Sequence, residues 1–167
     1  MTEQEKEKET QALKVWRKGM APQLTNDQLG CLRLALAHDD PRIIQGATTS
    51  PPPLQSVQGW PVEAADAVTF AFWQGIPGVL VWQAENWFAG ACFECDQRHH
   101  DPARCRYFLN WYDDFPRHQV FAKLQAEIER ELIIRLKIPL NDNTPGGVVR
   151  DWLLEHGRDT EAGWFGG

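Results

Sequence analysis

The sequence lacks an excess of positive charge and has no long apolar run. Its formal net charge is −6 at pH 7, whereas broad nucleic-acid binding depends on lysine and arginine side chains that displace counterions from phosphates. No stretch approaches the ~20 apolar residues that a membrane-spanning helix requires. The first ten residues are almost wholly polar and charged, unlike a secretory signal. These absences predict a cytoplasmic protein that does not enter membranes, and they argue against nucleic acid as its partner.

The common catalytic signatures are missing as well. The chain has no glycine-rich phosphate loop, no nucleophile elbow and no His-Glu-x-x-His pattern. Gly146 and Gly147 precede an expected helix, but no lysine follows at the offset that a phosphate loop needs. The sequence therefore favours a non-enzymatic protein over an enzyme.

Tryptophan and phenylalanine, by contrast, are abundant, with eight of each among 167 residues. Rings of this size bury large areas, so we expect most of them in the core and some on an interaction surface. The length suits one domain with a real core. We expect a disordered charged N-terminus at residues 1–12, a single globular domain at 13–157 and a flexible tail at 158–167.

Hydrophobic periodicity predicts a mostly helical α+β fold around a central β-hairpin. In the hairpin, residues 83–86 turn between a strand at 78–82 and a return strand at 87–93. For residues 67–73 a strand competes with a helix, because apolar side chains alternate there. The expected helices comprise one that carries Leu13, Trp16 and Met20, and others at 25–39, 61–75, 101–114, 117–137 and 148–156.

A long connection at residues 41–61 contains three consecutive prolines, Pro51, Pro52 and Pro53. Such a run favours a stiff, extended backbone without internal hydrogen bonds. A connection of this length is unusual in a compact domain and can wrap the surface or cover a site. Together with Trp164 and Phe165 in the tail, the three prolines are our candidates for contact with a partner.

Three of the four cysteines and two of the five histidines fall within one short stretch. Cys92, Cys95, His100 and Cys105 have the spacing C-x2-C-x4-H-x4-C, which supplies four ligands of the kinds that tetrahedral zinc prefers. His99 is an alternative to His100, since adjacent histidines point in different directions. We expect structural zinc that ties the end of the hairpin to the following helix.

This stretch resembles the retroviral-type zinc knuckle, which has the same ligand spacing and often an aromatic residue after the first cysteine, as at Phe93. The resemblance covers residues 92–105 only. The knuckle's glycines are replaced here by Asp96 and His99. Zinc knuckles bind single-stranded nucleic acid, so the resemblance implies such a role, against which the acidic composition argues.

Other interpretations of the cysteines stay open. They fit reduced core residues, or a redox pair formed by Cys92 and Cys95. Cys92 and Glu94 look like the first half of a zinc deaminase signature, whose second half is missing. Nucleic-acid contact would use the arginines at positions 98, 104 and 106.

The sequence thus predicts a non-enzymatic, zinc-stabilised adaptor or accessory protein that binds another protein. A thiol-redox or metal-dependent enzyme is the alternative, and nucleic-acid contact through the Cys/His segment is the third.

Overall fold

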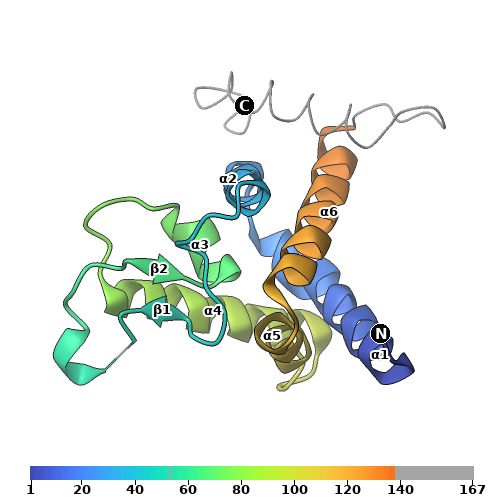
Figure 1. The fold of residues 1–167 in the computed structure, drawn as a ribbon, viewed down its shortest axis with the longest axis horizontal. Coiled ribbons are helices and arrows are strands. Elements are labelled where there is room, and N and C mark those ends of the chain that lie inside the picture. Colours follow the sequence, from blue (N-terminus) through green and yellow to red (C-terminus); the bar gives the residue numbers. More distant parts are fainter. Residues whose placement is uncertain (53, 138–167) are drawn as a thin grey trace.

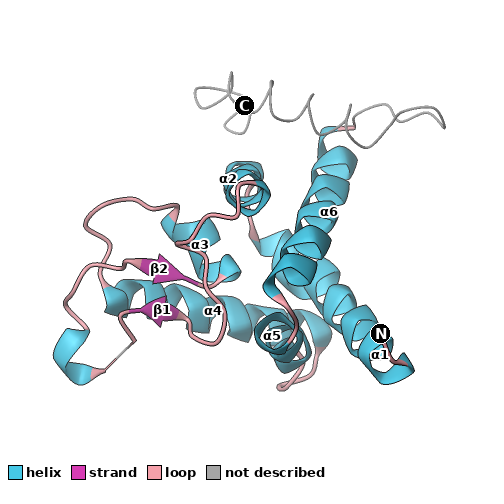
Figure 2. Cartoon of the chain, in the orientation of Figure 1, coloured by secondary structure: helices cyan, strands magenta, loops and turns pink. Residues whose placement is uncertain are grey.

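Helices dominate residues 1–52 and 54–137, the part of the chain that the computed structural model describes (Figures 1 and 2). Within those ranges the α-helices are α1 (Glu3–Val15), α2 (Asn26–Ala37), α3 (Ala67–Trp73), α4 (Val81–His99), α5 (Cys105–Asp114) and α6 (Arg117–Leu136). Short helical turns of other kinds are η1 (Trp16–Met20), η2 (Ala21–Gln23) and η3 (Gln55–Val57). Strands β1 (Thr49–Ser50) and β2 (Ala64–Ala65) form one small antiparallel pair. This composition is compatible with an α+β fold.

The expected hairpin at residues 78–93 is wrong, because a single helix, α4, covers most of it. Its buried side chains, at Val81, Ala84, Ala91 and Cys95, recur at helical intervals and face the rest of the chain. The expected turn at residues 83–86 lies in the first helical turns, where the Gln83 side chain accepts a hydrogen bond from the backbone N–H of Leu80 at 2.9 Å. The antiparallel pair lies elsewhere, with Thr49 opposite Ala65.

Residues 3–12, expected to be disordered, belong to α1. The Thr2 hydroxyl caps this helix by accepting from the Glu5 N–H at 3.1 Å. Glu9, Ala12 and Val15 form its buried face. The Glu9 carboxylate also accepts a hydrogen bond from Gln119 on α6 at 3.2 Å. A few buried residues are enough to hold α1 against the domain, because its remaining charged side chains lie on the solvated side.

The other helices agree more closely with the sequence. Helix α2 begins with the expected capping box, in which Thr25 and Gln28 exchange hydrogen bonds of 3.1 and 2.9 Å. Helix α6 matches the expected 117–137 almost throughout. Helix α5 starts at Cys105 rather than near 101, and α3 occupies only 67–73 of the expected 61–75. The strand β2 and the capping residue Asp66 precede α3.

A cluster of aromatic rings forms the centre of the core. Trp16, Phe108, Trp111 and Tyr112 are almost fully buried. The ring centroids of Trp16 and Phe108 lie 5.4 Å apart, and those of Phe108 and Tyr112 lie 6.0 Å apart. Part of the aromatic excess therefore belongs to the core, as expected. These rings join the N-terminal segment to α5, on which α1 packs.

Ion pairs and carbonyl contacts fix α6 against the N-terminal half of the chain. Arg17 binds Glu127 through two hydrogen bonds of 2.7 and 2.6 Å. Near the other end of the described chain, Arg135 donates to the carbonyl oxygens of Leu24 and Ala21 at 2.6 and 2.8 Å. These contacts reinforce the packing of α6 on α2.

Several sequence predictions fall outside the described residues. They concern Pro53, the helix at 148–156, the tail at 158–167 with Trp164 and Phe165, and the C-terminal limit of the domain. Among the residues that the structure does describe, no helix is both long and apolar enough to cross a membrane.

Candidate functional site

Helix α4 places three of the chemically active side chains on one face. Cys92, Cys95 and His99 are separated by three and four residues, so they project from the same side of the helix. Cys95 is 0% exposed, whereas Cys92 and His99 are half-buried. This face packs on η1, the π-helical turn that follows α1.

Gly19 in η1 allows this close packing. A Cβ atom at Gly19 would lie 2.4 Å from the Cys95 Sγ and 2.7 Å from the His99 Cε1. Both distances are too short for van der Waals contact, so any side chain here would displace the Cys95 sulfur and the His99 ring. The missing side chain of Gly19 therefore seats Cys95 and His99 against the N-terminal segment.

Cys105 reaches the same place from α5, of which it is the first residue. Its backbone N–H donates a hydrogen bond of 2.8 Å to the Asp96 Oδ1, and its Sγ lies 3.8 Å from the Asp96 Oδ2. Asp96 on α4 thus supplies the acceptor that a capping residue ordinarily gives to the first turn of a helix. This contact anchors the start of α5 beside α4.

Cys92 and Cys105 lie near enough that an interaction between their thiols shifts the pKa of each. The interaction with Cys105 raises the pKa of Cys92, and burial raises it further. The same interaction lowers the pKa of Cys105, although burial opposes this effect. For Cys95, burial raises the pKa to about 12. The pKa of Cys105 is thus lowered, whereas the pKa values of Cys92 and Cys95 are raised.

The two histidines differ sharply in position. The Nδ1 of His99 lies 2.9 Å from the carbonyl oxygen of Cys95 and 3.9 Å from its Sγ. When Nδ1 donates to that carbonyl, Nε2 carries the lone pair that a metal would use. His100 ends α4 with a left-handed φ of 53° and is exposed. The structure thus brings His99, rather than His100, to the sulfurs.

The four side chains form two pairs, Cys92 with Cys105 and Cys95 with His99. As they stand, no three His, Cys, Asp or Glu side chains of residues 1–52 and 54–137 are arranged to hold a metal ion. The junction between the pairs also differs from expectation, since it joins a helix to a helix instead of a hairpin to a helix. A shared metal centre would require rotation of these side chains.

A buried carboxyl group, Asp66, was not identified from the sequence. It caps α3 by accepting from the Thr69 N–H at 2.7 Å. Burial raises the pKa of Asp66 to about 7, and the nearby carboxylates of Asp113 and Glu85 act in the same direction. The only sequence signal was an aspartate three residues before a threonine at the start of an apolar stretch.

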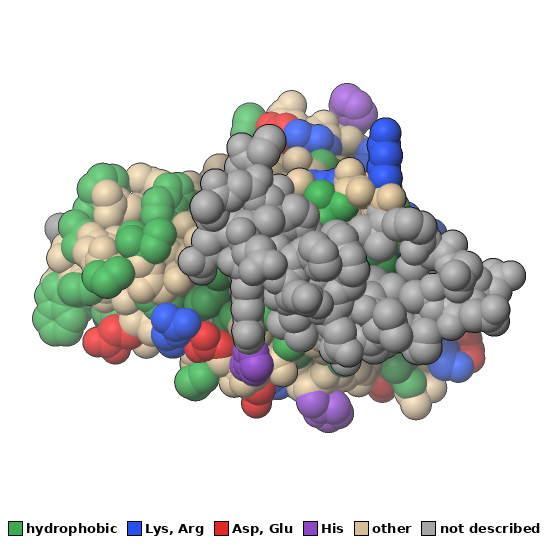
Figure 3. All heavy atoms as spheres, turned by 90° about the horizontal axis from the view of Figure 1, so that it is seen from above, with side chains coloured by type: hydrophobic (Ala, Val, Ile, Leu, Met, Phe, Trp, Pro, Cys, Tyr) green, Lys and Arg blue, Asp and Glu red, His purple; other side chains and the backbone are tan. Residues whose placement is uncertain are grey.

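A second feature is an apolar surface at the end of the molecule where α4 begins. Leu54, Trp60, Ile76 and Trp82, which we call the aromatic end, are all large and exposed. Backbone hydrogen bonds from Val81 to Trp60 at 2.9 Å and from Trp82 to Gln58 at 3.1 Å join the two loops. Figure 1 shows these loops together at the left of the molecule, and Figure 3 shows hydrophobic side chains gathered there. Two of the expected contact residues, Pro51 and Pro52, lie in the same connection and are half-buried and exposed, respectively.

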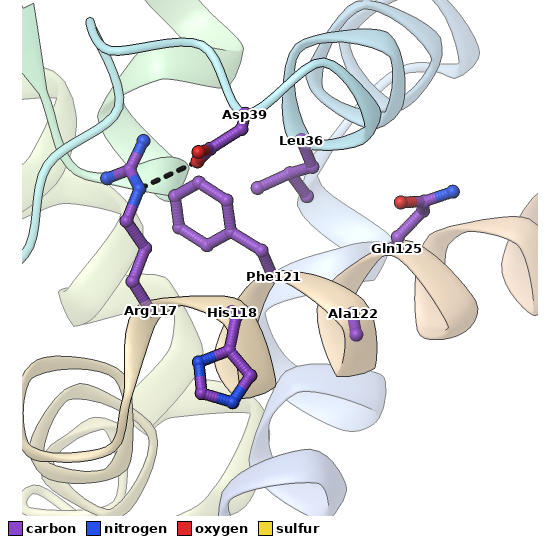
Figure 4. A pocket seen from close by; sticks show the side chains of 7 residues that line it. All are labelled: Leu36, Asp39, Arg117, His118, Phe121, Ala122 and Gln125. Atoms are coloured by element: carbon purple, nitrogen blue, oxygen red, sulfur yellow. Dashed lines mark hydrogen bonds and ion pairs between the residues drawn. The ribbon is translucent and has the colours of Figure 1, made fainter.

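A hollow of about 450 Å³ lies between α2 and α6. In Figure 4 the Phe121 ring lies between Arg117 and Leu36, and His118 points away from them. Arg117 is held by Asp39 at 2.8 Å and by the carbonyl oxygen of Asp40 at 2.8 Å, and it lies 4.1 Å from the centre of the Phe121 ring. Because these contacts occupy the guanidinium group, the hollow offers mainly an apolar floor.

Comparison with known protein families, curated proteins and solved structures gives no match for this chain. Its function is therefore argued from the residues themselves.

Replacing Gly19 tests the seating of α4. We expect Gly19→Ala to lower the free energy of unfolding by about 1–3 kcal/mol, because the new methyl group must displace the buried Cys95 sulfur. Gly59→Ala is the matched control, since a Cβ there meets nothing within 4 Å. Urea denaturation of both variants measures the difference. Equal stability of the two variants would show that α4 does not approach η1 this closely.

The buried Asp66 predicts a specific pH dependence. Its pKa is raised in the folded chain from 3.8 to about 7, so the folded state binds the proton more tightly than the unfolded state. Stability should therefore fall as the pH rises between these two values, by about 4 kcal/mol at most, and then level off.

The Asp66→Asn variant should lose this decline, because a neutral amide can still accept from Thr69. Denaturation curves across this pH range measure the effect, and Asp27→Asn, at an exposed position, controls for the loss of an aspartate. Parallel pH profiles for the wild type and Asp66→Asn would contradict the prediction.

Proposed function

We propose that this chain is a non-enzymatic protein-interaction protein, an adaptor or accessory subunit, stabilised by a structural zinc ion. The observation that carries the metal proposal is the convergence of two elements. Helix α4 presents Cys92, Cys95 and His99 on one face, and α5 brings Cys105 near enough to Cys92 to shift its pKa. We place this role in the cytoplasm, where thiols are usually reduced and available as ligands.

The donor set suits zinc in kind. Three cysteine sulfurs and one imidazole are a common ligand set for closed, structural sites. Bound there, the ion would fasten α4 to the start of α5. The neighbouring guanidinium of Arg106 already lowers the pKa of Cys105, although less strongly than the interaction with Cys92 does. The pKa values of Cys92 and Cys95 are raised, so zinc would have to displace the protons of these two thiols on binding.

Burial favours a structural use of these cysteines over a catalytic one. Cys95 is 0% exposed and Cys105 is 8% exposed, whereas a redox-active thiol must be reached by its substrate. Cys92, the half-exposed member, has a raised pKa because its thiol interacts with that of Cys105. A thiol-redox or metal-dependent enzyme that uses Cys92 and Cys95 is thus the second candidate.

Charge pairing within the chain also weighs against the nucleic-acid alternative. Arg98 is bound to Glu94 at 3.0 Å, and Arg104 is bound to Asp101 at 3.1 Å. These two arginines would have to give up carboxylate partners before they could bind phosphates. The resemblance to nucleic-acid-binding knuckles therefore extends to the kinds of ligand alone, since His99 in place of His100 changes their spacing.

The aromatic end supplies the surface for a protein partner. Trp60 is 56% exposed, and tryptophans that become buried on binding are frequent anchors of protein interfaces. Large apolar side chains that gather at one exposed place commonly mark interaction sites. We assign this end, with the adjoining Pro51 and Pro52, to contact with another protein.

Metal analysis tests the zinc proposal. We expect one zinc ion per chain in the full-length protein purified without chelators. His99→Gln should weaken zinc binding by about tenfold or more, whereas His100→Gln should leave it unchanged. Cys105→Ser should lose the metal together with part of the thermal stability, and Cys31→Ser, on α2, is the control. The readouts are elemental analysis and competition with a chromogenic chelator.

A folded protein without metal would refute this proposal. Fast alkylation of Cys92 at neutral pH in the same sample would favour the enzyme alternative. Equal effects of His99→Gln and His100→Gln would remove His99 from the ligand set.

Charge at the aromatic end should abolish partner binding. We expect Trp60→Asp to lose proteins that co-purify with the tagged full-length chain, because a carboxylate cannot enter an apolar interface without a large desolvation penalty. Ile134→Asp is the matched control, since Ile134 is an exposed apolar residue on α6, away from this end. Quantitative mass spectrometry compares the three samples. An unchanged set of co-purified proteins in Trp60→Asp would exclude this surface.

A further inference from the structure

The start of α5 places Cys105 beside the part of α4 that carries Cys92. The Cys105 N–H donates to the Asp96 Oδ1 at 2.8 Å, and the Cys105 Sγ lies 3.8 Å from the Asp96 Oδ2. Cys92 and Asp96 are four residues apart on α4, so their Cβ atoms are neighbours, about 5–6 Å apart, on one face of the helix. The shift that each of the two thiols causes in the pKa of the other agrees with this placement.

The other two cysteines are directed elsewhere. The Cys95 sulfur faces Gly19 of η1, lies 3.9 Å from the His99 Nδ1 and is 0% exposed. Its effect on Cys92 is also weaker than that of Cys105. Cys31 lies on α2, which packs on α6 and α3. Cys92 and Cys105 are therefore the two cysteines best placed to bond to each other.

The chain between Cys92 and Cys105 is folded back on itself in the reduced protein. The Asp101 N–H donates to the carbonyl oxygen of Asp96 at 3.1 Å, and the Ala103 N–H donates to the Asp101 Oδ1 at 3.0 Å. Because these contacts return α5 to α4, most of the entropy lost on closing this loop has been lost before any bond forms between the sulfurs. A disulfide needs Cα atoms about 4.4–6.8 Å apart, so rotation of two side chains and a small shift at the start of α5 complete it.

A small oxidant can reach this pair. Cys92 is half-buried, and Cys105 is 8% exposed. A catalytic thiol needs room for a substrate, whereas a sulfur that is only oxidised needs access for a molecule as small as hydrogen peroxide. Disulfides in the cytoplasm are usually transient and sense redox conditions. The pair is thus suited to a reversible change of state.

We propose that Cys92 and Cys105 form a reversible intrachain disulfide under oxidation, and that this bond switches off zinc binding at the junction of α4 and α5. The loss of zinc rests on the metal site of the proposed function, whereas the disulfide itself requires no metal. Both states tie α4 to α5, through the ion in the reduced protein and through the S–S bond in the oxidised one. Cys95 and His99 alone supply two ligands, which is too few for a closed tetrahedral site.

A peroxide is the oxidant. Each thiol gives up one proton and one electron as the S–S bond forms, while the O–O bond of hydrogen peroxide breaks and its oxygens leave as two water molecules. When zinc is bound, the two thiolates give the electrons, solvent supplies the two protons, and zinc leaves as the divalent ion. A small thiol such as glutathione reverses the change by attack on the S–S bond through a mixed disulfide, and is itself oxidised to its disulfide.

Peptide mapping of the full-length protein after treatment with hydrogen peroxide tests the disulfide. Remaining thiols are alkylated, and the unreduced protein is digested with trypsin. Cleavage after Arg98 and Arg104 separates Cys105 from Cys92, but it leaves Cys92 and Cys95 on one peptide, so mass spectrometry distinguishes the two possible pairs. We expect the Cys92 peptide linked to the Cys105 peptide, and we expect dithiothreitol to remove the link.

Serine variants and zinc release complete the experiment. Cys92→Ser and Cys105→Ser should each abolish the link, whereas Cys95→Ser and the control Cys31→Ser should keep it. A chromogenic chelator should capture one zinc ion for each disulfide formed. The oxidised wild type should bind zinc at least roughly tenfold more weakly than the reduced protein, because two ligands have been consumed.

A peroxide-treated wild type without the Cys92–Cys105 link, or with a Cys92–Cys95 link in its place, overturns the disulfide and leaves the zinc site standing. An oxidised protein that keeps its zinc overturns the switch. A chain purified without metal that still forms the link supports the disulfide and refutes the zinc site, so failure of one proposal is distinguishable from failure of the other.

Discussion

The contact between α4 and η1 at Gly19 is the constraint on which the rest of the structure depends. Since Gly19 has no side chain, Cys95 and His99 can lie against the N-terminal segment. That seating fixes the rotation of α4 about its own axis, and one rotation decides the surroundings of all its residues. The sulfurs turn inward toward α5, where Cys92 lies near Cys105, and uncharged residues such as Gly90 turn outward. The rotation of α4 therefore decides both which of its residues face α5 and which are exposed to solvent.

The parts of the fold that the sequence predicts well are those with local signals. The capping residues Thr25 and Gln28 mark the start of α2, and the spacing of Phe121, Leu124, Ile128 and Leu132 marks the buried face of α6. The hairpin prediction failed because two short apolar stretches around residues 83–86 fit a strand or a helix equally well. Burial of Val81, Ala84, Ala91 and Cys95 against distant elements decided between them, and such contacts leave no local trace. Residues 3–12 of α1 were missed for the same reason, since the few buried residues there depend on contacts with α5.

The candidate site was predictable in composition but not in geometry. The spacing of Cys92, Cys95 and Cys105 drew attention to the right segment. The choice between His99 and His100 depends on where α4 ends, because the left-handed backbone at His100 directs that side chain into solvent. The sequence around Gly19 and Asp66 gives almost no indication of their structural roles. The first acts through contacts with residues far along the chain, and the second has its raised pKa only because the surrounding fold removes water from it.

The joining of the N-terminal segment to the last described helices has a consequence for how the chain forms during synthesis. The Trp16 ring packs against Phe108, and Arg17 is bound to Glu127, so this segment finds its partners only after α5 and α6 have been synthesised. Until then Ala12, Val15 and Trp16 face water, or whatever chaperone covers them. Closing so long a loop has an entropic cost that slows this contact relative to local ones. A chain released before residue 105 would expose that apolar stripe permanently and would be a target for quality-control proteases.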